Sequence, residues 1–368
     1  MRAAPLARVL SCLLVVLLWI GLHPGCTSSP AAAADASLAS AAASDVDASG
    51  GWLPCDTGAA ASLRGLAVVD RRIAYVGGSG GTILRTEDGG RSWQDVAPPN
   101  CGDCDFRDLE ALDANRVLAM VAGQPARVYR TADGGRSWRI VHADPRPEAF
   151  FDAMARRGDQ VVLFGDAIDG RFALLVSDDQ GVTWRSGPGV VQALPRAAAG
   201  EAGFAASGTC VVGGGGGYSL VTGGGPARLV RFDVGAAGQP PMFVDEDLPL
   251  QRGGPSSGGF SVAWASERVL VVGGDYQRPE LREGSGARSF DGGKTFAAVD
   301  VGGFRSAVVW LDDGQRALAV GSHGASTSQD AGATWQPFGS VGFHALAVAA
   351  DGWVWACGSD GRVARIAP

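Results

Sequence analysis

One eight-residue phrase occurs five times in this chain and constrains its fold more than any other feature. Its form is Ser/Thr-x-Asp-x-Gly-x-Ser/Thr followed by an aromatic residue, as in Thr131–Trp138. The third-position aspartates are Asp88, Asp133, Asp179, Asp291 and Asp330. They lie 45, 46, 112 and 39 residues apart, so the chain is built from a repeated unit.

Each copy lies between two apolar runs, which predicts a strand, a tight turn and a second strand. An aspartate at the start of a turn accepts hydrogen bonds from nearby backbone N–H groups. The glycine two residues later supplies a positive φ angle. The aromatic residue begins the next strand, and truncating such a buried ring costs about 3–5 kcal/mol. We therefore interpret the five aspartates as structural rather than as catalytic acids or metal ligands.

A period of about 40–45 residues with short strands is typical of a β-propeller. The 112-residue interval predicts one unit that has lost the phrase, at 203–245. A further unit after the last copy has candidate strands at 343–349, 353–357 and 363–366. We therefore predict an all-β, seven-bladed β-propeller over residues 51–368 with four-stranded antiparallel blades. The segment 51–55 is expected to add the last strand and close the ring, which removes free sheet edges.

The first 25 residues are expected to be a signal peptide outside this fold. Arg2 and Arg8 precede an apolar run, Val9–Leu22, that is too short for a typical membrane span. Residues 26–50 are rich in Ala, Ser and Asp and predict a flexible tether. We expect an exported, periplasmic protein. Two alternatives stay open for the mature N-terminus. Cys26 could carry a lipid anchor, or ordinary signal peptidase could cleave near residues 31–36.

Charge and cysteine content narrow the ligand classes. The formal net charge is −7, which argues against nucleic acid as a partner. The four histidines are scattered, and we expect no metal and no cofactor. Cys101-Gly-Asp-Cys104 is interpreted as a local disulfide in an oxidising compartment, with a metal site or a redox pair as alternatives. The protein is expected to be a monomer.

The face opposite the repeated turns is where we expect a binding site. The start of each innermost strand lines the mouth of the central channel there. The aligned pairs are Leu63-Arg64, Phe106-Arg107, Phe151-Asp152, Phe204-Ala205, Phe260-Ser261, Phe304-Arg305 and Phe343-His344. The second positions make Arg64, Arg107, Asp152, Arg305 and His344 the candidate residues. Such a mouth suits a carboxylate, a sugar acid or a peptide C-terminus. The alternative is that the arginines pair with nearby acids such as Asp108 and Asp152.

A long loop on the same face is a second candidate. Gly273–Arg288 replaces a short turn in the fifth unit and carries Tyr276 and Arg278. Long loops on a rigid scaffold often carry function. The alternative is a solvated, charge-balanced loop.

The repeated phrase is the Asp-box, or BNR repeat, and the fuller unit Ile73–Trp93 resembles the photosystem II stability/assembly factor family. The likeness covers residues 51–368 at the level of the blades. It implies a non-catalytic, exported propeller that binds a membrane-associated protein partner through an arginine-bearing face. Arg64, Arg107 and Arg305 are the positions that would serve here. The expected function is thus binding of a protein or envelope partner, as an assembly or stability factor for a membrane complex. Two units without the box and the loop at 273–288 depart from the family pattern.

A sialidase-like glycoside hydrolase is the enzymatic alternative, because that family uses the same boxes. It would need an arginine triad, conceivable in Arg64, Arg107 and Arg305, with Asp152 as acid/base. Phe304-Arg-Ser-Ala307 is the nearest fragment to the family's Phe/Tyr-Arg-Ile-Pro motif. Tyr75 and Tyr129 fall in mid-strand positions unsuited to a nucleophile. A binding propeller is therefore the favoured reading.

Overall fold

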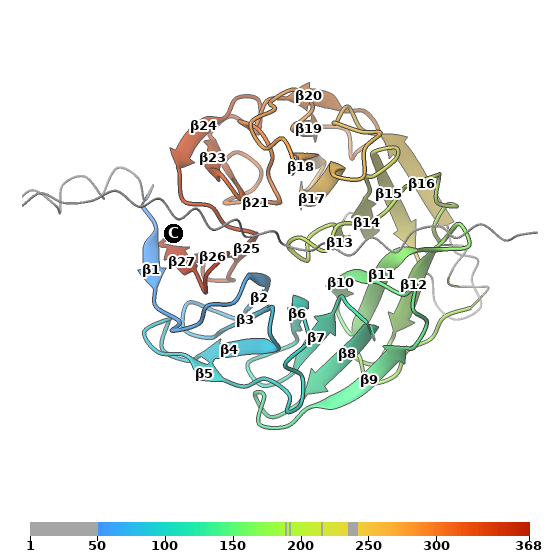
Figure 1. Ribbon diagram of the computed structural model, residues 1–368. Coiled ribbons are helices and arrows are strands. Elements are labelled where there is room, and N and C mark those ends of the chain that lie inside the picture. The colour runs from blue at the N-terminus through green and yellow to red at the C-terminus, as the bar shows by residue number, and fades with distance from the viewer. Residues whose placement is uncertain (1–50, 125, 188–189, 191–192, 215, 235–241) are drawn as a thin grey trace, which may run out of the picture. The chain divides into compact units, whose positions relative to one another are not determined.

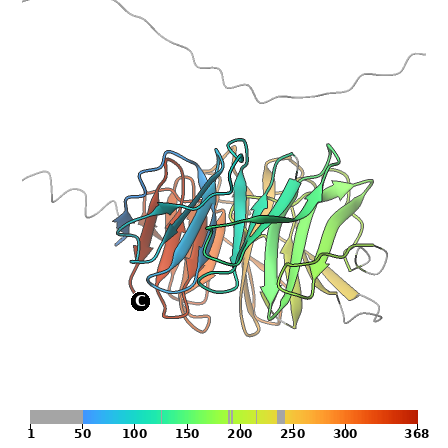
Figure 2. The ribbon, with the colours of Figure 1, turned by 90° about the horizontal axis from the view of Figure 1, so that it is seen from below.

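The computed structural model describes residues 51–368 apart from 125, 188–189, 191–192, 215 and 235–241. Within residues 51–368, seven small β-sheets are arranged as blades around a central axis (Figure 1). Seen edge-on, the strands run across the thickness of this ring (Figure 2). The predicted seven-bladed, all-β propeller is confirmed.

The strands follow one another around the ring in chain order. Blade one contains β2 (Leu63–Val68), β3 (Ala74–Gly78), β4 (Thr82–Thr86) and β5 (Gln94–Asp95). Blade two contains β6 (Phe106–Ala111), β7 (Val117–Val121), β8 (Ala126–Thr131) and β9 (Arg139–Asp144). Blade three contains β10 (Phe151–Arg157), β11 (Gln160–Ile168) and β12 (Arg171–Ser177). Blades four and five are β13 (Val211–Gly214), β14 (Gly217–Val221), β15 (Arg228–Asp233) and β16 (Met242–Asp247), then β17 (Ser257–Ala265), β18 (Arg268–Asp275), β19 (Gly286–Ser289) and β20 (Ala297–Val299). Blades six and seven are β21 (Ala307–Trp310), β22 (Ala317–Gly321), β23 (Gly324–Ser328) and β24 (Gln336–Gly339), then β25 (Ala345–Val348), β26 (Val354–Cys357) and β27 (Val363–Ile366) with β1 (Leu53–Cys55).

The ring closes through the first described strand, as predicted. β1 pairs antiparallel with β27, with Leu53 opposite Arg365 and Cys55 opposite Val363. The unit without a box at 203–245 forms the fourth blade, whose outer strand extends to Asp247.

The third blade departs from the prediction of four strands. Its sheet contains only β10, β11 and β12 among the described residues. After its Asp-box the chain makes two isolated bridges to β12, in which Val176 pairs with Arg185 and Arg171 pairs with Arg196. The described residues on this edge of β12 therefore form bridges rather than a fourth strand.

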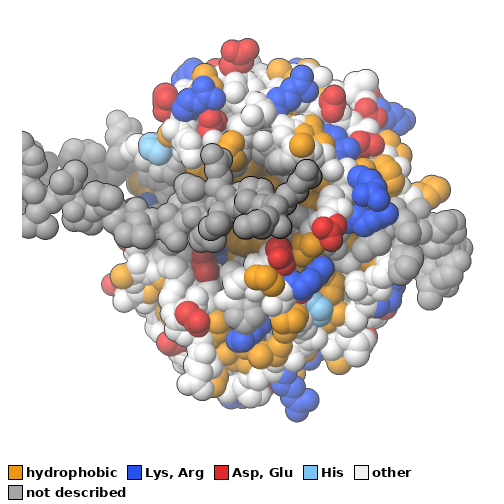
Figure 3. Space-filling view, turned by 45° about the vertical axis from the view of Figure 1, so that its right-hand side comes forward, with side chains coloured by type: hydrophobic (Ala, Val, Ile, Leu, Met, Phe, Trp, Pro, Cys, Tyr) orange, Lys and Arg blue, Asp and Glu red, His pale blue; other side chains and the backbone are white. Residues whose placement is uncertain are grey.

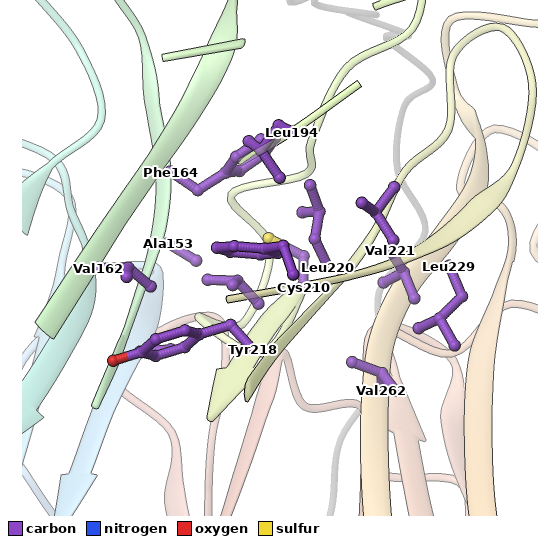
Figure 4. Packing of buried hydrophobic residues seen from close by; sticks show 14 of the residues in the cluster. Ala153, Val162, Phe164, Leu194, Cys210, Tyr218, Leu220, Val221, Leu229 and Val262 are labelled. Carbon is purple, nitrogen blue, oxygen red and sulfur yellow. The ribbon is translucent and has the colours of Figure 1, made fainter. Parts of the chain in front are cut away.

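The core consists of apolar side chains packed between neighbouring blades. The largest cluster joins blades three, four and five and includes Phe164, Tyr218 and Val262 (Figure 4). Tyr218 is 1% exposed and stacks on Phe232 with ring centroids 5.6 Å apart. This packing between blades fixes the inner strands, whose ends surround the axis.

The Asp-boxes connect the third and fourth strands of their blades and act as turn fasteners. Asp88 Oδ1 accepts the N–H groups of Arg91 and Ser92, and its Oδ2 accepts the Ser92 hydroxyl at 2.7 Å. The Thr86 hydroxyl donates to the same carboxylate and accepts the N–H of Gly90, whose φ is 82°. The hydrogen bonds from the hydroxyl and from backbone N–H groups recur in the other four boxes. They lower the pKa of Asp88 to about 2.

Cys101 and Cys104 form a disulfide on the segment between the first two blades. Cys55, Cys210 and Cys357 are free thiols. The predicted signal peptide, tether and lipidation site at Cys26 lie outside the described residues. Within the described part of the chain, no helix has the length and apolar character needed to cross a bilayer.

Candidate functional site

A cavity of about 520 Å³ lies at the mouth of the central channel and is called here the axial pocket. Hydrophobic side chains show in the hollow at the centre of the face seen in Figure 3, and charged side chains of both signs are interspersed around it. The lining residues used below are Arg64, Arg107, Asp152, Asp166, Phe204, Phe260, Tyr276, Phe304, Ser306, Ser322 and His344. They come from blades one, two, three, five, six and seven and, with Phe204, from the segment between blades three and four.

A β-bulge repeated at the start of the innermost strand places the first three of these side chains. In β2 the pairing steps from Leu63–Gly78 to Gly65–Gly77, which leaves Arg64 as the extra residue. The same irregularity leaves Arg107 unpaired in β6 and Asp152 unpaired in β10. A bulge leaves one residue without a partner and re-aims its side chain. Consecutive blades therefore direct a polar side chain at the axis from the same position.

The bulge also corrects the predicted register in blade five. Pairing there steps from Gly259–Gly273 to Ser261–Val272, so the extra residue is Phe260. Phe260 lines the axial pocket, whereas Ser261 is fully buried and accepts the N–H of Val308.

Arg305 does not line the axial pocket, although the sequence alignment placed it there. Its backbone N–H donates to Gly273 of the previous blade, as the Leu63 N–H donates to Gly358. It thus occupies the buried plug position, and Ser306 takes the place expected for it. The side chain is 6% exposed, and its guanidinium donates to the Ser326 hydroxyl at 2.6 Å and to the Phe304 carbonyl at 2.9 Å. Burial lowers its pKa to about 10.

Arg64 is a partly buried cation of the axial pocket, and Asp105 attracts it without forming an ion pair with it. Arg64 makes no hydrogen bond and no ion pair with any described residue. Its pKa is lowered, first by burial and then by repulsion from Arg107. Arg107 itself pairs with Asp105 at 2.7 Å and lies 6.0 Å from the centre of the Phe150 ring. The pairing with Asp108 considered from the sequence does not occur, because Asp108 accepts the N–H of Met154.

His344 lines the pocket as a neutral side chain at pH 7. Burial, together with the positive charges of Arg64, Arg362 and Arg107, lowers its pKa to about 4. Its Nε2 lies 3.0 Å from the Ser359 hydroxyl. The predicted cationic mouth is therefore a patch centred on Arg64 rather than a ring of positive charges.

Two carboxyl groups of the third blade form the acidic side of the pocket. Asp152 is 1% exposed, and neither of its oxygens forms a hydrogen bond of good geometry with a described residue, although the Ala205 N–H lies nearby. Burial raises its pKa well above the usual range, and the neighbouring Asp166 raises it further. Asp166 is the extra residue of a second bulge, in β11, and accepts the Gly203 N–H at 3.2 Å.

Four aromatic rings form the remaining side, called here the aromatic wall: Phe204, Phe260, Tyr276 and Phe304. Phe204 and Phe260 are stacked with centroids 3.8 Å apart, and Phe304 meets Phe260 edge-on at 4.8 Å. Tyr276 is 47% exposed and is the residue by which the loop at 273–288 reaches the pocket. Arg278 of that loop lies outside the pocket, 60% exposed and paired with Asp275 at 2.8 Å.

The arrangement does not match the enzymatic alternative. The arginine triad does not form, because Arg305 is buried away from Arg64 and Arg107. Tyr276 is the tyrosine that lines the pocket, but no glutamate of the described residues lines it with Tyr276. No group of three or more His, Cys, Asp or Glu side chains in the described part of the chain is arranged to hold a metal ion.

A comparison with models of known protein families indicates which family this chain resembles. A family model described as "Photosynthesis system II assembly factor YCF48" matches residues 45–201, which include the first three blades. The chain is an Asp-box propeller that resembles this assembly-factor family. No curated protein matches the sequence significantly.

Solved structures agree with the assembly-factor fold. A structure titled "YCF48 bound to D1 peptide" is 18% identical with a TM-score of 0.59, covering 86% of this chain and 97% of that one. YCF48 from Cyanidioschyzon merolae is 16% identical with a TM-score of 0.56, covering 86% and 99%. A streptogramin B lyase is 11% identical with a TM-score of 0.58, covering 85% and 96%. At such identities the likeness establishes the fold alone.

Sequence reasoning missed Asp166, Ser306 and three residues of the aromatic wall, Phe204, Phe260 and Phe304, as lining of one pocket. Asp166 follows Gly165 at the end of an apolar strand, and a polar residue at that place was the available signal. Ser306 was missed because the alignment of blade six was displaced by one residue.

Proposed function

We propose that this chain is a non-catalytic, exported propeller that binds a protein partner of the cell envelope through the axial pocket, as an assembly or stability factor for a membrane complex. The observation that carries the proposal is Arg64, a partly buried guanidinium without a hydrogen bond or ion pair among the described residues. A cation in such surroundings gains most from a carboxylate ligand, because the bidentate pair is a strong, charge-assisted interaction. The likeness to the assembly-factor family supports a protein as the source of that carboxylate.

Arg107 and His344 support Arg64 without duplicating it. The Arg107 charge is already balanced by Asp105, so this side chain contributes less net attraction. His344 is neutral and offers a hydrogen bond instead of a charge. The partner's carboxylate is therefore expected to lie against Arg64, with Arg107 at its side.

Capture of a partner from an envelope extract tests this function. Arg64→Ala should reduce capture at least tenfold, since a lost charged hydrogen bond costs about 1.5–3 kcal/mol. Arg278→Ala is the matched control, because Arg278 carries the same charge on the same face but lies outside the pocket. Equal capture by both variants and the unchanged protein would rule the proposal out.

Export is part of the proposal and has its own test. The positively charged and apolar N-terminal segment supports it. Mass spectrometry of the mature N-terminus distinguishes a lipid on Cys26 from cleavage near residues 31–36. An unprocessed Met1 in the purified protein would contradict export.

A further inference from the structure

The acidic side of the axial pocket has no part in binding a carboxylate and needs its own explanation. Asp152 and Asp166 come from the bulges of two neighbouring strands, β10 and β11, so both are placed by the same departure from regular pairing. Asp152 is 1% exposed. Burying an ionised carboxylate without donors is costly, and such groups are normally paired.

A proton shared between the carboxyl groups of Asp152 and Asp166 explains how Asp152 can be buried. As an ionised group, it would have only the backbone N–H of Ala205 as a donor nearby, in poor hydrogen-bond geometry. With a proton, it can donate to Asp166, and like charges at close range favour such sharing. The pair then bears one negative charge, and Arg107 interacts favourably with it. Asp166 is only half-buried and lines the pocket, so its remaining lone pairs face a ligand.

The backbone around the pair is fitted closely. A Cβ atom at Gly203 would lie 2.7 Å from Oδ2 of Asp152, and the Gly203 N–H already donates to Asp166. One donor of the protein, the Gly203 N–H, is thus used by the pair, and both carboxyl groups line the pocket.

Resting on the proposed function, we infer that the Asp152–Asp166 pair is a hydrogen-bond acceptor for an amide N–H of the ligand, and that the pocket takes a carboxylate-bearing residue with an aromatic side chain. The carboxylate lies on Arg64, the amide N–H donates to Asp166, and the ring packs on the aromatic wall. The amide is neutral, so its N–H can donate to a pair that bears a single negative charge without adding another charge to the pocket. A volume of about 520 Å³ accommodates one such residue with its neighbouring peptide group.

Three small probes separate these contacts in binding measurements by ligand-observed NMR. N-acetyl-L-phenylalanine has all three groups, 3-phenylpropanoate lacks the amide, and N-acetyl-L-phenylalaninamide lacks the carboxylate. The first should bind about fivefold more tightly than the second, as one net hydrogen bond predicts. In Asp166→Asn that advantage should vanish, because the amide NH₂ group replaces an acceptor oxygen facing the ligand. Asp169→Asn is the control, since Asp169 lies exposed on the β11–β12 turn outside the pocket.

The outcomes separate this inference from the proposed function. Equal affinity of the unchanged protein for the first two probes, an advantage that persists in Asp166→Asn, or no binding of any probe overturns the inference. In each of these cases, Arg64-dependent capture of an envelope protein would still uphold the function. If the probes discriminate as expected while capture does not depend on Arg64, the chemistry of the pocket stands and the protein-binding function falls.

Discussion

Arg305 occupies in the sixth blade the place that Leu63 occupies in the first. Each donates its backbone N–H to a glycine carbonyl on the preceding blade, Gly273 and Gly358 respectively. Leu63 is fully buried and Arg305 is 6% exposed, so both side chains plug the space between inner strands. A guanidinium thus stands where the first and seventh blades have an apolar side chain, Leu63 and Phe343.

Replacing Arg305 with Met should leave partner capture unchanged and raise the free energy of unfolding by about 1 kcal/mol. Among the described residues the guanidinium has neutral hydrogen-bond partners, Phe304 and Ser326, and no ion pair, and its Nε is buried without a partner. Exchanging a desolvated charge for an apolar side chain of similar length is often neutral or stabilising. Urea unfolding measures the change, and Arg64→Met is the comparison, because it should lose capture at little cost in stability. Loss of capture in Arg305→Met would show that this residue acts in the site after all.

The same pair of residues shows why the sequence predicted the fold better than the site. The spacing of the boxes gives the number of residues per blade. It predicted all seven blades, because an error of one or two residues in a boundary does not change the number of blades. A site depends on single residues, and a shift of one residue exchanges a buried side chain for a pocket-lining one. Phe304-Arg305 looked equivalent to Phe343-His344, yet the hydrogen bonds make Arg305-Ser306 the equivalent pair.

The bulges in the inner strands were a second obstacle to predicting the site. In a regular strand, side chains alternate between the two faces, and this alternation would not direct Arg64 at the axis. Arg64 reaches the axis because it is the extra residue of a bulge. Gly65 allows the close approach there, since a Cβ would lie 3.1 Å from Cγ of Leu109. A glycine after the bulge residue in blade one is not matched in blades two and three, where Asp108 and Ala153 follow. No common sequence signal therefore marks the bulge.

Ala331→Gly should stabilise the sixth blade. Ala331 follows the box aspartate with a φ of 56°, whereas the residue at this place is glycine in three of the five boxes. A side chain with Cβ is strained in this region, and the exchange is expected to gain about 0.5–1 kcal/mol. Thermal unfolding measures the gain. The control is Ala333→Gly two residues on, where φ is not positive and glycine should lower stability. A lower melting temperature for Ala331→Gly would contradict the reading of this position.

Acid should weaken the propeller through its box aspartates. Hydrogen bonds from hydroxyl and N–H groups hold the pKa of Asp88, Asp133, Asp179 and Asp330 at about 2, below the unfolded value. Because the folded pKa is depressed, the stabilisation is present above the unfolded pKa of about 3.9 and is lost as pH falls toward 2. Circular dichroism with urea at pH 5, 4, 3 and 2 should show a falling midpoint.

A box variant separates this effect from general acid expansion. Asp330→Asn keeps the size of the side chain but cannot be protonated in this range, so its midpoint should fall less steeply between pH 4 and 2. Asp351→Asn serves as the control, since Asp351 is an exposed aspartate on a turn of the last blade. Identical slopes for both variants would show that the boxes do not account for the acid sensitivity.

Closure of the propeller depends more on one aromatic side chain than on the three backbone residue pairs of β1. Trp52 precedes that strand, is 5% exposed, and packs against Phe343 with centroids 4.6 Å apart and against Phe338 at 6.0 Å. Trp52→Ala should therefore cost about 3–5 kcal/mol of unfolding free energy, the range for truncating a buried aromatic. Leu53→Ala in the same segment is the control and should change stability by no more than about 0.5 kcal/mol, because Leu53 is 47% exposed. Loss of the anchor also leaves the outer edge of β27 unpaired, so Trp52→Ala should aggregate more readily than Leu53→Ala on heating. If the two variants unfold at the same urea concentration, the backbone pairing of β1 with β27 closes the ring without help from the tryptophan.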